Sequence, residues 1–168
     1  MTTPVRSGSS SRGKVSFFTV EPEASGSPAA DSSPGEVACV FDTWLGDDLI
    51  RAHPVLMVTT PVKRALLRLQ GASGFEITRA CVRTSPFFRR HSPGQRLPPF
   101  WAIQVRGHAG REDLGLTAAG ILVVSRRVLD VLLDFRIGRA VLTQYAPGGR
   151  RAAGPDRGGR PPANGRSK

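Results

Sequence analysis

Apolar residues form two continuous runs, at 55–58 and 121–124, and a hydroxyl residue follows each run. Short apolar runs that are rich in β-branched residues predict buried strands. A hydroxyl at the end of such a strand can accept hydrogen bonds from the free N–H groups at a helix start, which is where Thr59 or Thr60 and Ser125 lie. The pattern therefore predicts, at two places, a strand that leads directly into a helix.

Each following segment carries apolar residues at helical spacing. They fall at positions 62, 65, 66 and 69 and at positions 128, 131, 132 and 135, which is one buried stripe along each helix. Pro61 suits the first turn of a helix, where its missing N–H costs nothing. Gly71, Gly74 and Gly138 are expected to end the helices. Second strands are expected at 75–82 and 140–145.

The two segments form an internal repeat with a constant offset of 66 residues. The matched pairs are Leu56 and Leu122, Val58 and Val124, Thr59 and Ser125, Val62 and Val128, Leu66 and Leu132, Leu67 and Leu133, and Leu69 and Phe135. With a shift of one residue, 75–78 matches 140–143 and 47–49 matches 112–114.

Helices of about ten residues need a sheet to cover their apolar stripes. The repeat therefore predicts an α/β (α+β) fold, a small mixed sheet covered by helices, with strand–helix–strand units at about 47–82 and 112–145.

The two ends of the chain differ from this central part. Residues 1–35 are rich in Ser, Gly and Pro, and residues 147–168 in Arg, Gly and Pro, so both are predicted to be disordered. A β-like run at 15–20 fits a short strand at the sheet edge. Residues 36–146 are expected to form one domain. Without an 18-residue apolar run or a secretory signal, a cytoplasmic protein that does not span a membrane is expected.

The net charge of +11 is unevenly distributed: residues 1–35 contribute 0, residues 36–146 contribute +6 and residues 147–168 contribute +5. All but three of the 24 basic residues are arginines. A bias toward Arg, Gly, Pro and Ala is also what a GC-rich genome encodes. Basicity is therefore weak evidence for nucleic-acid binding, although a cationic surface attracts polyanions.

Motifs for catalysis are missing from the sequence. It has neither a Gly-x-Ser-x-Gly elbow nor a phosphate-binding glycine motif. Asp47 and Asp48 with His53 are the residues from which a metal site could be built, but the two aspartates equally fit a capped turn or a helix start. Cys39 and Cys81 have apolar neighbours and are expected to be buried free thiols. No catalytic residue, metal or cofactor is therefore predicted.

Residues 84–99 are expected to form a long loop that is rich in Pro, Arg and aromatic residues, before a strand at 100–106. Aromatic and arginine side chains supply most hot spots of protein interfaces, and arginines pair with carboxylates. The predicted partner-binding residues are Phe88, Arg89, Arg90, Arg96 and Trp101. In the competing interpretation, the aromatic residues belong to the core and the arginines are a solvated rim.

A nucleic-acid-binding accessory protein is the alternative function. Arginines of the loop 84–99 and of the tail would then contact phosphates, with a steep salt dependence. The tail residues in this interpretation are Arg150, Arg151, Arg157 and Arg160.

The segment Gly-Ile-Leu-Val-Val-Ser at 120–125, followed by Val128, Leu132 and Phe135, resembles the C-terminal part of the Imm11-like immunity proteins of bacterial polymorphic toxin systems. The resemblance covers about residues 109–145, with a fainter similarity at 53–82. It implies a bacterial protein that binds and occludes a partner toxin, and it supplies no catalytic residues. The sequence as a whole thus predicts a non-enzymatic protein-interaction module.

Overall fold

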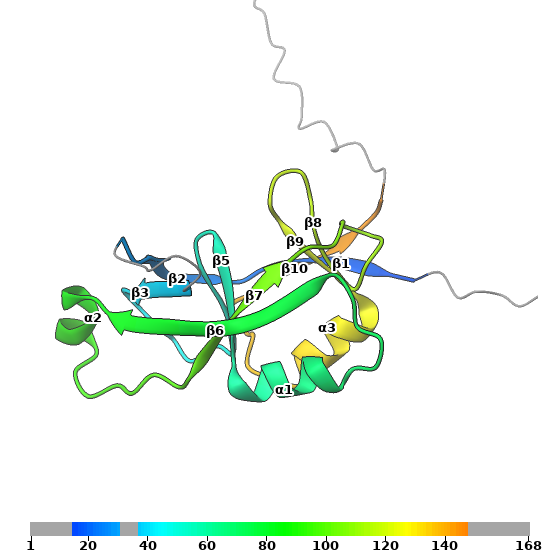
Figure 1. Ribbon diagram of the computed structural model, residues 1–168. Coiled ribbons are helices and arrows are strands. Elements are labelled where there is room, and N and C mark those ends of the chain that lie inside the picture. Colours follow the sequence, from blue (N-terminus) through cyan, green and yellow to red (C-terminus); the bar gives the residue numbers. More distant parts are fainter. Residues whose placement is uncertain (1–14, 31–36, 148–168) are drawn as a thin grey trace, which may run out of the picture.

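The computed structural model describes residues 15–30 and 37–147. These ranges contain ten strands and three helices, arranged as a barrel and a second sheet (Figure 1). The six strands of the closed barrel are, in hydrogen-bonded order, β2 (Glu23–Pro28), β3 (Val37–Phe41), β6 (Phe75–Thr84), β7 (Phe100–Val105), β5 (Val55–Thr59) and β4 (Leu49–Ala52). The antiparallel second sheet has the order β10 (Val141–Tyr145), β1 (Phe17–Glu21), β9 (Leu122–Ser125) and β8 (Leu114–Leu116).

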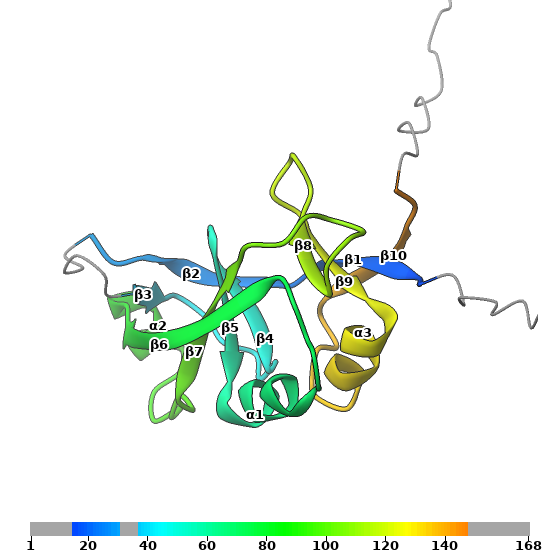
Figure 2. The ribbon, with the colours of Figure 1, turned by 45° about the vertical axis from the view of Figure 1, so that its right-hand side comes forward.

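The helices occupy two different places. Helices α1 (Thr60–Arg68) and α3 (Arg126–Leu133) lie side by side on one side of the sheets and contact each other (Figures 1 and 2). Helix α2 (Pro86–His91) follows β6 at the far end of the barrel (Figure 1). In the described ranges, no helix has the length and apolar character needed to cross a membrane.

Two apolar clusters form the core, and alternation along the strands separates them. On β5, Met57 faces the barrel interior, whereas Leu56 and Val58 face the helices and the second sheet. The outer cluster also contains Val62 and Leu66 of α1 and Val128, Leu129 and Leu132 of α3. The helical stripes predicted from the sequence are therefore confirmed. The inner cluster contains Cys39, Phe41, Ile50, Ala52, Met57, Phe88 and Phe100.

The architecture corrects several details of the expected fold. The structure is a mostly-β α+β protein with a barrel and a separate sheet, whereas one small sheet covered by helices was predicted. Strand β1 lies inside the second sheet and not at an edge, and β2 occupies residues 23–28, within a segment predicted to be disordered. Helix α2 lies within the predicted loop 84–99. Cys39 is buried as expected, whereas Cys81 is half-buried.

Each strand–helix–strand unit of the repeat encloses a strand from elsewhere in the chain. In the first unit, β5 and β6 both pair antiparallel with β7, which lies between them. In the second unit, β9 and β10 both pair antiparallel with β1, which lies between them. Because β1 precedes the first unit and β7 precedes the second, each half of the chain inserts its leading strand into the other half.

The strand registers extend the repeat to these leading strands. Thr59 pairs with Phe100, and its counterpart Ser125 pairs with Phe17, so Phe100 corresponds to Phe17. Continuing in register, Phe-Trp-Ala-Ile of β7 corresponds to Phe-Phe-Thr-Val of β1. The order β4-β5-β7-β6 likewise matches β8-β9-β1-β10. The molecule is therefore a pair of interlocked halves, to which β2, β3 and α2 are additions.

Candidate functional site

Helix α2 carries most of the residues that were predicted to bind a partner. Ser85 is its N-cap, and the Ser85 hydroxyl accepts a hydrogen bond from Phe88 N at 3.1 Å. Pro86 occupies the first turn, where no N–H is required. The Phe87 and His91 rings stack with centroids 4.0 Å apart on the exposed side of the helix. A serine cap followed by proline is a sequence signal for a helix, and it could have located α2 inside the predicted loop.

The structure separates the five predicted residues into two groups. Phe88 is only 2 % exposed and packs in the barrel core, so its ring is not part of the surface. Trp101 is half-buried: its Nε1 donates to Thr60 Oγ1 at 3.0 Å, and Lys63 Nζ lies 2.9 Å from the ring centroid. Both aromatic residues are thus engaged within the fold.

Arg89, Arg90 and Arg96 are exposed, as is Phe87, and we call these four residues in and just after α2 the α2 face. Arg89 Nη1 donates to the Thr84 carbonyl oxygen at 2.5 Å, a contact that leaves the rest of its guanidinium open to solvent. Within the described ranges, none of these three arginines forms an ion pair. The α2 face therefore presents three cationic groups that have no acidic partner in the part of the chain that the structure describes.

The residues on both sides of the α2 face in the sequence add further positive charge. Residues 77–111 contain seven arginines and no aspartate or glutamate. This segment forms most of β6, all of α2 and β7, and the turns that join them. Acidic residues resume at Glu112, so this segment contributes no negative charge of its own, although Arg106 within it forms an ion pair with Glu76. The tail residues Arg150, Arg151, Arg157 and Arg160 lie outside the described residues.

The residues considered for a metal site have other contacts. Asp47 Oδ2 accepts a hydrogen bond from Arg139 N at 3.0 Å, and Asp48 Oδ2 accepts one from Arg136 N at 3.0 Å. His53 is exposed in the turn between β4 and β5. In residues 15–30 and 37–147, no three His, Cys, Asp or Glu side chains come together as a metal site.

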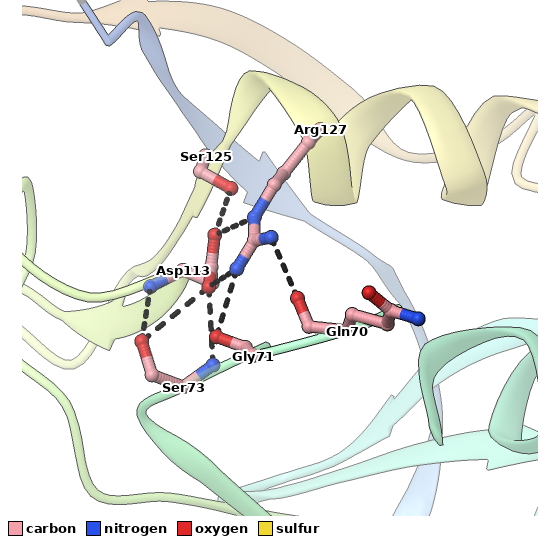
Figure 3. Close-up of polar contacts among 6 residues, drawn as sticks. All are labelled: Gln70, Gly71, Ser73, Asp113, Ser125 and Arg127. Atoms are coloured by element: carbon pink, nitrogen blue, oxygen red, sulfur yellow. Dashed lines mark hydrogen bonds and ion pairs between the residues drawn. The ribbon is translucent and has the colours of Figure 1, made fainter. Parts of the chain in front are cut away.

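A buried carboxylate that the sequence analysis did not single out lies between the two halves (Figure 3). Asp113 Oδ1 accepts hydrogen bonds from Ser125 Oγ and Arg127 Nε, each at 2.7 Å. Its Oδ2 accepts from Arg127 Nη2 at 2.5 Å and from Ser73 N at 3.1 Å. These donors, with Arg127 the strongest, lower the pKa of Asp113 to about 2 although burial opposes the change.

Arg127 extends this network to the first half of the chain. Its Nη1 and Nη2 donate to the carbonyl oxygens of Gln70 and Gly71, each at 2.9 Å, in the turn that follows α1 (Figure 3). Every guanidinium nitrogen is therefore used as a donor, and both oxygens of Asp113 are used as acceptors. An acid–base pair that is fully engaged in this way fixes the position of α3 relative to α1, so we assign it a structural role.

The first half contains the corresponding contact. Thr59 Oγ1 donates to Asp48 Oδ1 at 2.6 Å, as Ser125 Oγ donates to Asp113. Thr59 and Ser125 are the N-cap residues of α1 and α3, but their side chains make no capping hydrogen bond. The expected capping role is therefore corrected: each hydroxyl donates a hydrogen bond to the aspartate just before the previous strand, which is Asp48 before β4 and Asp113 before β8. An aspartate preceding Leu49 and Leu114 was the available sequence signal.

Comparison with known proteins does not assign this chain to a family. No family model, curated protein or solved structure matches it.

Proposed function

We propose that this protein is a non-enzymatic interaction module whose α2 face binds an acidic surface of a partner protein. The observation that carries the proposal is the run of seven arginines without an acidic residue at 77–111, of which Arg89, Arg90 and Arg96 are exposed without an ion pair in the described ranges. Arginine forms paired hydrogen bonds with carboxylates, and it is enriched in interface hot spots. Phe87, which is 46 % exposed, adds apolar contact area on the same helix as Arg89 and Arg90.

The engagement of Phe88 and Trp101 within the fold favours a protein partner over single-stranded nucleic acid. Binding of single strands depends on several aromatic rings that stack on successive bases. The α2 face offers Phe87 alone among Phe, Tyr and Trp, and that ring already stacks on His91. A toxin occluded by this face is the specific partner that the resemblance to Imm11-like immunity proteins implies, and it remains part of the proposal.

The test compares two charge reversals of equal size in the whole chain. Arg89→Glu with Arg90→Glu alters the α2 face, whereas Arg64→Glu with Arg68→Glu alters exposed arginines of α1. The probes are a fluorescent deca-glutamate peptide and a mixed-sequence DNA duplex, measured by anisotropy at low and moderate salt. We expect the α2-face variant to bind the peptide roughly 100-fold more weakly, because two charge-assisted contacts are each worth about 1.5 kcal/mol or more. The α1 variant should retain most of the binding.

Both variants should keep the thermal midpoint of the parent protein, because the altered side chains are exposed. Equal losses in the two variants would mean that net charge alone attracts the peptide, and this would overturn the proposed face. Tighter binding of the duplex than of the peptide, abolished by the α2-face variant, would replace the protein partner by nucleic acid.

A further inference from the structure

A cavity of about 330 Å³ lies where the barrel meets the second sheet. Its lining includes four buried aliphatic residues, Val20, Leu56, Ile103 and Leu122. These residues are two pairs of corresponding positions in the interlocked halves, because Val20 of β1 matches Ile103 of β7 and Leu56 of β5 matches Leu122 of β9. Both halves therefore contribute the same apolar wall to one cavity.

The polar part of the lining differs between the halves. Arg51 pairs with Leu56 across β4 and β5, whereas the corresponding position in β8 is Leu116, which pairs with Leu122. The turn between β4 and β5 adds His53, where the turn between β8 and β9 adds Ala119. At these two positions, one half thus supplies a guanidinium and an imidazole, while the other half supplies apolar groups. The remaining polar lining residues are Gln104 of β7 and, at the corresponding position of β1, Glu21. Such a cavity suits a ligand with one anionic end and one apolar end.

Arg51 is incompletely satisfied within the described residues. Its Nε is buried and has no hydrogen-bond partner there. The neighbours Ile50 and Ala52 point into the barrel, so Arg51 points outward toward the cavity, which it lines. A buried N–H group without a partner is unfavourable by about 1–3 kcal/mol, and the Arg51 charge is not neutralised by a carboxylate among the described residues. A carboxylate in the cavity would pair with the part of the guanidinium that lines it.

We propose that this cavity binds a small monocarboxylate with an apolar body, whose carboxylate pairs with Arg51 and whose hydrocarbon lies against the aliphatic wall. The volume is suited to a small ligand, at the lower end of the usual range for binding pockets. Glu21 is an exposed part of the lining, so a ligand with two or three negative charges is disfavoured. This site is separate from the α2 face, and its occupancy does not depend on the function proposed above.

The experiment is a titration of the isotope-labelled whole chain, followed by amide chemical shifts in NMR. The probes are 4-methylpentanoate, its neutral analogue 4-methylpentanamide, and inorganic phosphate. We expect 4-methylpentanoate to shift the backbone amide signals of the residues around the cavity. Neither 4-methylpentanamide nor phosphate should shift these signals appreciably. Absence of shifts with 4-methylpentanoate at about 10 mM, well above the Kd of a weak 1 mM ligand, would overturn the proposal. Equal shifts with the neutral amide would do the same.

Two variants test whether Arg51 and the cavity hold the carboxylate ligand. Arg51→Gln should weaken the carboxylate roughly tenfold or more, because it removes a charge-assisted hydrogen bond. The same substitution at the exposed Arg64 is the control and should leave binding unchanged. Ala119→Trp narrows the cavity from its exposed side without altering Arg51, and it should also abolish binding. If Arg51→Gln folds and binds 4-methylpentanoate with unchanged affinity, the proposed site is refuted. If Arg51→Gln does not fold, unchanged affinity in Ala119→Trp refutes it.

Discussion

Replacing Asp113 by Asn tests whether the contact between the interlocked halves stabilises the fold. The pKa of Asp113 falls from 3.8 to about 2, which corresponds to about 2 kcal/mol of stabilisation when the carboxylate is ionised. The Asp113 side chain is only 10 % exposed, but the Arg127 side chain is 45 % exposed, so solvent screening weakens their attraction. We therefore expect Asp113→Asn to lower the free energy of unfolding by about 2 kcal/mol at pH 7, and the thermal midpoint by roughly 5–10 °C.

The pKa shift of Asp113 also determines how the stability of the protein depends on pH. The pKa of Asp113 is lower in the folded protein than in the unfolded chain, so its contribution is complete above about pH 4 and is lost as the pH falls toward 2. The variant cannot ionise at this position at any pH. The difference in stability between parent and variant should therefore be about 2 kcal/mol at pH 7 and should shrink steadily below about pH 4.

Urea unfolding of both proteins between pH 7 and about pH 2.5 measures this difference. Asp130→Asn is the matched control, because Asp130 is an exposed member of an ion pair with Arg126 on α3, the helix that carries Arg127. Asp130→Asn should lower the free energy of unfolding by at most about 0.5 kcal/mol. A difference for Asp113→Asn that stays constant with pH, or one no larger than that of the control, would refute the role assigned to the buried carboxylate.

Two further pairs of substitutions test the packing. Phe88→Ala should reduce stability by about 3–5 kcal/mol, whereas Phe87→Ala should cost less than about 1 kcal/mol, as measured by urea unfolding; similar losses would contradict the burial of Phe88. Gly74→Ala combines a positive φ of 87° with overlap of the new Cβ and the Leu114 carbonyl oxygen, whereas Gly71, with φ 64°, has open space around it. Gly74→Ala should therefore be the more destabilising by about 2 kcal/mol, and equal thermal midpoints for the two variants would exclude the close approach.

The sequence predicted local elements well because burial leaves a local periodic signal. The apolar runs at 55–58 and 121–124 do form β5 and β9, and the stripes through Val62 and Val128 do face the core. Periodicity reports which side of an element is covered, but it does not identify the element that covers it. The placement of β7 and β1 inside the opposite halves therefore could not be derived from the pattern alone.

The candidate site was predicted only in part, for a related reason. Arg89 and Phe88 are neighbours in the sequence, yet the turn of α2 exposes the first and buries the second. A loop was assumed there, and a loop gives no basis for separating adjacent side chains by face. The hydrogen bonds from Thr59 to Asp48 and from Ser125 to Asp113 were missed because a hydroxyl at a helix start is expected to cap that helix. The aspartate that accepts instead lies 11 or 12 residues earlier in the sequence.

The position of β1 has a consequence for the order of events during synthesis on the ribosome. Strand β1 emerges before every other described strand, yet its hydrogen-bonding neighbours are β9 and β10, which emerge last. Until they appear, β1 has no native partner, and closing so long a loop slows folding. Nascent chains of this protein should therefore stay without a completed second sheet until β9 and β10 have been synthesised, with both edges of β1 open to contacts with other molecules in the meantime.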